Sequence, residues 1–132
     1  MIYTLIIHNA PYQSATAGTA LRFAKATLAA GHSIHRVFFY RDGVYTANTL
    51  TAPPRDEQNI PALWQQLAQE HQLDMVVCIA AAVRRGVLDE HEAKRYEKTA
   101  HNLAEGFELS GLGQLVEASI VSDRVVTFGG PQ

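Results

Sequence analysis

Residues 75–83, MVVCIAAAV, form the longest unbroken apolar run in the 132-residue chain. The first part, Met75–Cys78, is rich in valine and apolar at every position, which predicts a strand buried on both faces of a parallel sheet. The second part is rich in alanine and predicts a short helix that begins near Ala80 and breaks at Gly86. A buried strand that leads directly into a helix is half of a βαβ unit and indicates an α/β fold.

The same alternation continues towards both ends of the chain. Further strands are predicted at Ile2–Ile7, Ile34–Tyr40, Phe107–Leu109 and Val125–Phe128. Helices are expected from Ser14 or Thr16 to Gly31, from Pro61 to Gln72, from Asp89 to Leu103, and after Ser110. We therefore expect a single three-layer α/β/α domain over residues 1–128, with a mostly parallel sheet of about five strands. Residues 129–132 would form a C-terminal tail.

Two connections carry predictions of their own. Residues 41–59 are rich in turn-forming residues, with Pro53-Pro54 at their centre, and loops above about 12–15 residues are usually functional or mobile. The charged run over 89–103 predicts a helix with a solvated face. Ser110 is expected to cap the last helix. The inward-facing positions of that helix are predicted to be Leu112, Leu115, Val116 and Ala118.

Composition restricts the class of protein. Charged residues make up 18% of the chain, below the usual share of about 25%, which indicates that part of the surface is covered by another subunit. A net charge of -2 argues against tight nucleic-acid binding. One cysteine excludes an intrachain disulfide framework and favours a reducing compartment. The chain shows neither a secretory signal pattern nor an apolar run of about 20 residues, so we expect a soluble, cytoplasmic protein.

Cys78 is the strongest candidate for a reactive residue. It ends its predicted strand, and the sites of open α/β sheets lie beyond the carboxyl ends of the strands. The helix that follows directs its positive N-terminus at the sulfur and favours the nucleophilic thiolate, to which Arg84 and Arg85 would add. The alternative is a small buried core residue, as free cysteines commonly are. With no second cysteine, a dithiol mechanism is excluded and single-thiol group transfer remains open.

Other residues at this edge give weaker signals. His8 ends the first strand, where a satisfied, partly buried histidine is the favoured interpretation. The six histidines show no metal-ligand spacing, and neither a metal nor another cofactor is expected. The turn Ser110–Gly113 is similar to a phosphate-binding turn but lacks the dinucleotide fingerprint, so an ordinary helix start is favoured over a small-ligand site.

Three segments together resemble a known family. They read FFYRDGV at 38–44, VCIAAAVRRG at 77–86 and SGLGQL at 110–115. In combination they are similar to the DsrE/TusD family of small bacterial sulfurtransferases, most of all to its TusD branch, over residues 1–128. The resemblance implies that Cys78 accepts sulfane sulfur as a persulfide and passes it to a cysteine of a carrier protein. It assigns no role to His8, Tyr40, Asn48 or Arg85.

The resemblance also implies partners and a pathway. The TusD branch supplies sulfur for 2-thiolation of the wobble uridine of tRNA. Members assemble with two smaller homologous subunits, TusB-like and TusC-like, into a heterohexamer. A persulfide donor protein and a small acceptor carrier complete the relay, and because a later enzyme modifies the tRNA, direct tRNA binding is not expected. Two alternatives stay open: a DsrE-like subunit of dissimilatory sulfur oxidation, and a non-catalytic scaffold subunit of the same assembly.

Overall fold

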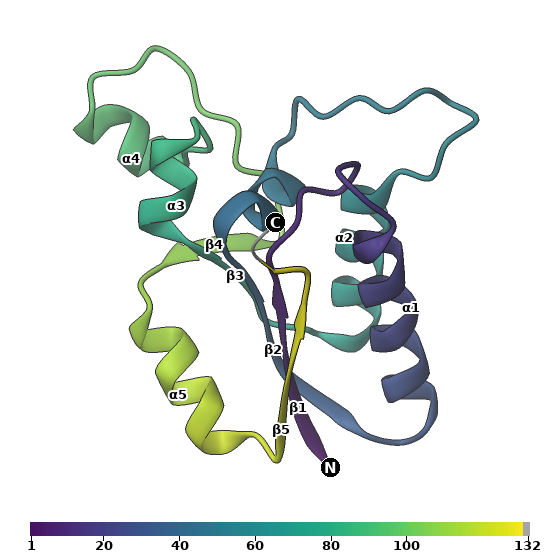
Figure 1. Ribbon diagram of the computed structural model, residues 1–132. Coiled ribbons are helices and arrows are strands. Elements are labelled where there is room, and N and C mark those ends of the chain that lie inside the picture. The colour runs from purple at the N-terminus through teal and green to yellow at the C-terminus, as the bar shows by residue number, and fades with distance from the viewer. Residues whose placement is uncertain (131–132) are drawn as a thin grey trace.

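Five short apolar segments form one parallel sheet in the computed structural model, which describes residues 1–130 (Figure 1). The strands are β1 (Ile2–Ile7), β2 (Ser33–Phe39), β3 (Met75–Cys78), β4 (Phe107–Ser110) and β5 (Arg124–Phe128). All five predicted strands are confirmed, each to within one residue at either end. Their order is β4-β3-β2-β1-β5, and every neighbouring pair is parallel. The predicted tail over 129–132 lies partly outside the described residues.

The helices cover both faces of this sheet, which confirms the three-layer prediction (Figure 1). One face carries α1 (Thr16–Ala29) and α2 (Ile60–His71), and the other carries α5 (Gly113–Val121). The strand order explains why α5 lies on the other face. The chain runs from β4 at one edge of the sheet to β5 at the opposite edge, beside β1, which reverses the direction of the earlier crossovers. A right-handed crossover in the reversed direction places its helix on the opposite face. Two short helices, α3 (Ile79–Arg84) and α4 (Glu90–Arg95), lie near the carboxyl ends of the strands. No helix within residues 1–130 is long and apolar enough to cross a bilayer.

A buried arginine ties α5 to the sheet. The guanidinium of Arg36 on β2 donates to Asp74 Oδ2 at 2.8 Å, to the Gln114 carbonyl at 2.8 Å and to Glu117 Oε2 at 2.6 Å. Glu117 also meets His35 Nε2 at 3.1 Å, and hydrogen bonds to His35 and then to Arg36 hold the pKa of Glu117 below its ordinary value. The charged hydrogen bonds from Arg36 to Gln114 and Glu117 therefore take the place of part of the apolar packing that was expected between α5 and the sheet.

The prediction for the inward face of α5 is therefore partly wrong. Ala118 is buried, but Leu112 is 46% and Val116 61% exposed. Ser110 does not cap the helix, because Leu112 occupies the N-cap position and no side chain caps it. The helix turns the stripe that contains Glu117 towards Arg36, and this rotation leaves an apolar stripe outside.

Residues 41–59 are more ordered than predicted. They begin with a 3-10 helix, η1 (Arg41–Ala47), whose Val44, Thr46 and Ala47 are buried, so only the remainder is an irregular loop. Gly43 allows this packing: a Cβ there would lie 2.1 Å from the Ile7 carbonyl oxygen of β1. The sequence feature that could have indicated this order is the presence of apolar residues, Val44 and Ala47, within the turn-rich segment.

Two predicted helix boundaries are also wrong. The helix expected over 89–103 ends at Arg95, because Glu97 adopts a left-handed φ of 57° and the Lys98 amide donates to the Ala93 carbonyl at 2.8 Å, which closes the last turn. Further along, Asn102 donates to Asn48 Oδ1 at 3.1 Å and to the Gly86 carbonyl at 3.0 Å. At α1 the N-cap is Ala15, and the hydroxyl of Ser14 accepts from the Thr16 amide at 3.3 Å and from Asn9 Nδ2 at 3.1 Å. The predicted end of α1 is confirmed, with Gly31 at φ +88° following the helix.

Candidate functional site

The backbone register brings four side chains to one level at the carboxyl edge of the sheet. Cys78 of β3 pairs with Ser110 of β4. Continued by one residue, the registers between β3, β2 and β1 place Tyr40 beside Cys78 and His8 beside Tyr40. Residues at one level of parallel strands point to the same face. We call Ser110, Cys78, Tyr40 and His8 the edge row.

Aromatic contacts show which face the edge row occupies. The ring of Phe39 meets Trp64 of α2 at a centroid distance of 5.7 Å, so Phe39 points to the face covered by α1 and α2. Its neighbour Tyr40 must point to the opposite face, where its ring lies 5.9 Å from that of His8 and 6.2 Å from that of Phe38. By register, Cys78 shares this face, which is the one that carries α5.

Cys78 is the last residue of β3 and the N-cap residue of α3, at φ -60° and ψ 116°. It therefore stands at the predicted end of its strand. The residue is only 2% exposed, and its side chain makes no capping hydrogen bond. A thiol placed in this way exchanges sulfur only with a reagent that is brought to the edge of the sheet, because attack on sulfur requires access.

An ion pair braces the two segments beside Cys78. Nε of Arg85, at the end of α3, donates to Asp42 Oδ1 of η1 at 2.8 Å, and Nη1 donates to the Ala81 carbonyl at 3.2 Å. This pair links the segment that follows β3 to the segment that follows β2. Asp42 carried no role in the sequence prediction. The signal that could have identified it is its position directly after a predicted strand.

Within residues 1–130, the prediction that the ring nitrogens of His8 have hydrogen-bond partners is wrong for Nδ1. Burial, followed by the nearby positive charge of Arg41, lowers its pKa, so the ring is neutral at pH 7. Its Nδ1 is buried and meets no hydrogen-bond partner among residues 1–130. Arg41 itself adopts a left-handed φ of 51°, which is uncommon for a residue with a side chain. The neutral ring of His8 and the cation of Arg41 thus lie close together where β1 and β2 end, at one side of the edge row.

The other features considered in the sequence are Asn48, the turn after Ser110 and a possible metal site. Asn48 has a structural contact set: its Oδ1 accepts from the Leu50 amide at 2.9 Å and from Asn102 Nδ2 at 3.1 Å. In the turn after Ser110, a Cβ added at Gly111 or Gly113 would meet nothing within 4 Å, so no close backbone approach requires these glycines. Within residues 1–130, no three His, Cys, Asp or Glu side chains are arranged to hold a metal ion.

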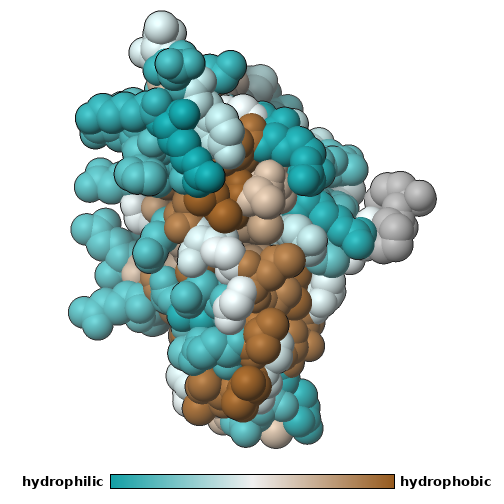
Figure 2. Space-filling view, turned by 90° about the vertical axis from the view of Figure 1, so that its left-hand side faces the viewer, coloured by the Kyte–Doolittle hydropathy of each residue, from teal (hydrophilic) through white to brown (hydrophobic). Residues whose placement is uncertain are grey.

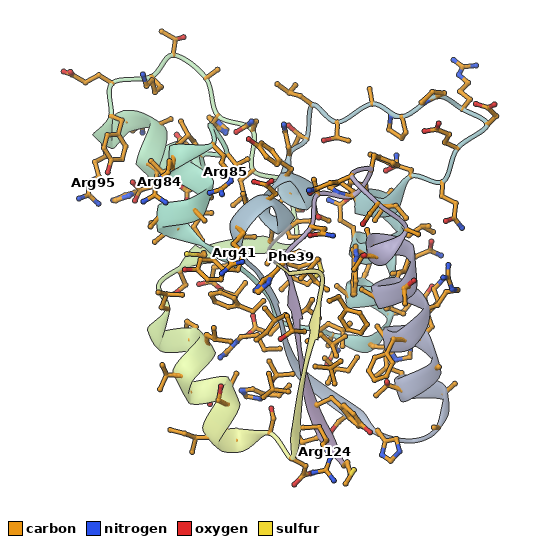
Figure 3. All side chains as sticks on the ribbon, in the orientation of Figure 1. Phe39, Arg41, Arg84, Arg85, Arg95 and Arg124 are labelled. Atoms are coloured by element: carbon orange, nitrogen blue, oxygen red, sulfur yellow. The ribbon has the colours of Figure 1, made fainter. Side chains whose placement is uncertain are left out.

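A groove opens between α3 and α4, beginning at the residue after Cys78. Its volume is about 380 Å³, and we call it the α3–α4 groove. Its lining consists of Ile79, Ala80, Val83 and Arg84 from α3, with Glu92, Arg95 and Tyr96 from α4 and its end. Figure 3 shows Arg84, Arg85 and Arg95 together at this end of the molecule, above Arg41. The groove was not foreseen, because the angle between two short helices leaves no trace in a hydropathy pattern.

Sequence comparisons with known proteins show one family, and a solved structure shows the same fold. The model of the DsrE/DsrF-like family matches residues 1–128. DsrE of Allochromatium vinosum is 53% identical over 129 residues, which cover 98% of this chain and 99% of that protein. Sulfurtransferase TusD of Cronobacter sakazakii is 50% identical over 128 residues, 97% of this chain and 100% of that protein. The crystal structure of the ychN protein from E. coli has the same fold, with a TM-score of 0.75 at 23% identity over 97% of this chain and 100% of that one.

Proposed function

This chain belongs to the DsrE/DsrF-like family, and on that basis we propose that it is a sulfurtransferase subunit that carries sulfur as a persulfide on Cys78. The observation that carries the proposal is the position of the only cysteine, at the carboxyl edge of β3 and the start of α3. Both full-length relatives named above are called DsrE or sulfurtransferase TusD. A lone thiol at this edge of the sheet suits a relay and does not suit dithiol redox chemistry.

The proposed chemistry consists of two thiol exchanges. The Cys78 thiolate attacks the outer sulfur of a donor persulfide, forms Cys78–S–SH and releases the donor as its thiolate. An acceptor thiolate then attacks the outer sulfur of Cys78–S–SH, takes it and releases the Cys78 thiolate. Each step forms one sulfur–sulfur bond and breaks one, so the sum requires neither an oxidant nor a reductant.

We assign the relay to 2-thiolation of the tRNA wobble uridine, in the cytoplasm, because several relatives carry the name sulfurtransferase TusD. The donor would be a persulfide protein and the acceptor a small carrier with a reactive cysteine. Because DsrE of Allochromatium vinosum is 53% identical, a role in dissimilatory sulfur oxidation is the second candidate.

An exposed apolar stripe supports assembly with other subunits. It consists of Val116, Ile120 and Val121 on α5 together with its N-cap residue Leu112, and Ile120 is 80% exposed. Figure 2 shows apolar residues gathered over the lower half of the molecule, on the side where Figure 1 places α5. Extended apolar patches on a soluble domain usually mark an interaction site. We propose that two smaller homologous subunits cover such surfaces in a heterohexamer.

Mass spectrometry of the Cys78 peptide tests the proposal. After incubation with a persulfide donor, the wild-type peptide should gain one sulfur atom, and the Cys78→Ser protein should gain none. Serine is similar in volume, so the variant should fold and assemble normally. If Cys78 stays unmodified, and Cys78→Ser still supports tRNA thiolation in cells, the chain is a scaffold subunit and the proposal is wrong.

A further inference from the structure

We propose that the α3–α4 groove binds an acidic segment of the acceptor protein that also carries an apolar anchor residue, and that this contact brings the acceptor cysteine to Cys78. The inference rests on the proposed function and adds to it the chemistry by which the acceptor is recognised. Nothing in the proposed relay itself specifies where, or through which side chains, an acceptor binds.

The position of the groove is the first argument. Its lining starts at Ile79, the residue after Cys78, and continues along the outer side of α3 to Val83. Because Cys78 is only 2% exposed, an acceptor thiol reaches it efficiently only when its own chain is held beside the first turn of α3. Binding of a neighbouring segment supplies this by raising the effective concentration of the thiol.

The shape and polarity of the groove are the second argument. Ile79, Ala80 and Val83 form an apolar wall, with the half-exposed ring of Tyr96 opposite. A volume of about 380 Å³ lies at the low end of the range for ligand pockets. It is sufficient for one or two side chains of a peptide, so we expect an apolar residue such as leucine to occupy it.

The charge around the groove is the third argument. Arg84 is exposed and forms no ion pair within residues 1–130. Arg95 lies 5.5 Å from the centre of the Tyr96 ring. The carboxylate in the lining, Glu92, is 5% exposed and already meets Arg95 at 3.8 Å and His91 at 3.6 Å.

The other acidic side chain of α4, Glu90, pairs with Lys94 at 3.3 Å. The rim therefore presents two guanidinium groups to an incoming chain, with the two carboxylates of α4 already engaged. Guanidinium groups bind carboxylates with two parallel hydrogen bonds, which favours glutamate or aspartate on the ligand.

Peptide binding to the full-length protein tests this inference. The probe is a fluorescein-labelled octapeptide with one cysteine, two leucines and two glutamates, compared with the same peptide carrying lysines in place of the glutamates. Fluorescence polarisation at low salt should show that wild type binds the acidic peptide at least about fivefold more tightly. The Arg84→Glu/Arg95→Glu protein should lose that preference and bind the lysine peptide better.

Arg124→Glu is the matched control, since Figure 3 places Arg124 at the opposite end of the sheet. It makes the same change in net charge per substitution and should retain the wild-type preference. Equal binding of the two peptides to wild type, an equal effect of Arg124→Glu, or no binding up to about 1 mM would each overturn the inference.

A second readout separates this inference from the proposed function. Each protein is first loaded with sulfur from inorganic polysulfide, and transfer to the peptide thiol is then measured per loaded molecule. The acidic peptide should receive sulfur severalfold faster from wild type than from the double variant. If wild-type Cys78 never loads, the proposed function fails while the binding experiment still decides the groove. If loading is normal and the double variant transfers at the wild-type rate, only the groove is wrong.

Discussion

Substitution of Gly43 by alanine should destabilise the protein strongly, because η1 has no space for a methyl group at this position. The added Cβ would lie 2.1 Å from the Ile7 carbonyl oxygen and 2.8 Å from its carbon, both backbone atoms of the interior strand β1. The contact can be relieved only if η1 moves away from the sheet. That movement would disturb two hydrogen bonds of the Gly43 amide, to the His8 carbonyl at 3.1 Å and to the Tyr40 carbonyl at 2.9 Å.

The magnitude follows from these contacts. Overpacking in a well-packed region costs about 1–3 kcal/mol. Weakening one or two backbone hydrogen bonds adds about 1 kcal/mol, so the free energy of unfolding should fall by about 2–4 kcal/mol. In a chain of this size, such a loss lowers the melting temperature by roughly 6–15 °C.

Urea unfolding followed by tryptophan fluorescence measures the effect. Trp64 is the only tryptophan and is 1% exposed, so its emission reports loss of the core. Gly111→Ala is the matched control, because a Cβ there meets nothing within 4 Å, and its free energy of unfolding should stay within about 0.5 kcal/mol of wild type. A Gly43→Ala protein as stable as wild type, or a Gly111→Ala protein equally destabilised, would refute the steric reasoning.

Three further outcomes follow from the charged groups. The pKa of Glu117 is lowered by its partners, so these contacts stabilise the fold above a pH of about 4.5 and the stabilisation is lost as the pH falls further. The difference in unfolding free energy between wild type and Glu117→Gln should therefore shrink below that pH, and a constant difference would contradict this. His8 has a lowered pKa, so its neutral form favours the fold above a pH of about 6.5, and acidification should destabilise wild type more than His8→Gln between pH 6.5 and 5. Equal pH profiles of these two proteins would exclude His8 as the source. Asp42→Asn breaks the partly exposed ion pair to Arg85, which should cost at most about 1 kcal/mol yet speed alkylation of Cys78 by iodoacetamide severalfold, as measured by mass spectrometry. Unchanged alkylation would show that this pair does not restrict access.

Local sequence determined the strands because their signal is a short-range one. The most buried strand, β3, is a run of apolar residues, and burial on both faces removes the need for an alternating pattern. The same reasoning located Cys78 at the end of β3, since the run changes from valine-rich to alanine-rich at that residue. The end of α1 was also predictable from the local sequence, because glycine readily adopts the positive φ that Gly31 has after the helix.

Helix ends and helix faces were less predictable, because they depend on single backbone conformations and on distant partners. The helix expected over 89–103 stops early because Glu97 adopts a left-handed φ of 57°, and no glycine marks this position in the sequence. The face of α5 was misjudged because Arg36, a residue of β2 some 80 positions away, holds Glu117 by a charged hydrogen bond. Arg36 lies outside the segment whose orientation it decides.

Sequence alone thus determined the fold class, the strands and the position of the one thiol at a strand end, because these depend on hydrophobic runs and on the presence of a single cysteine. Only the tertiary structure decided what surrounds that thiol. The strand order β4-β3-β2-β1-β5 sets Tyr40 and His8 in one row with Cys78, and the Asp42–Arg85 pair joins η1 to α3. The α3–α4 groove depends on how two short helices pack, and packing arises from contacts between residues that a linear pattern does not bring together.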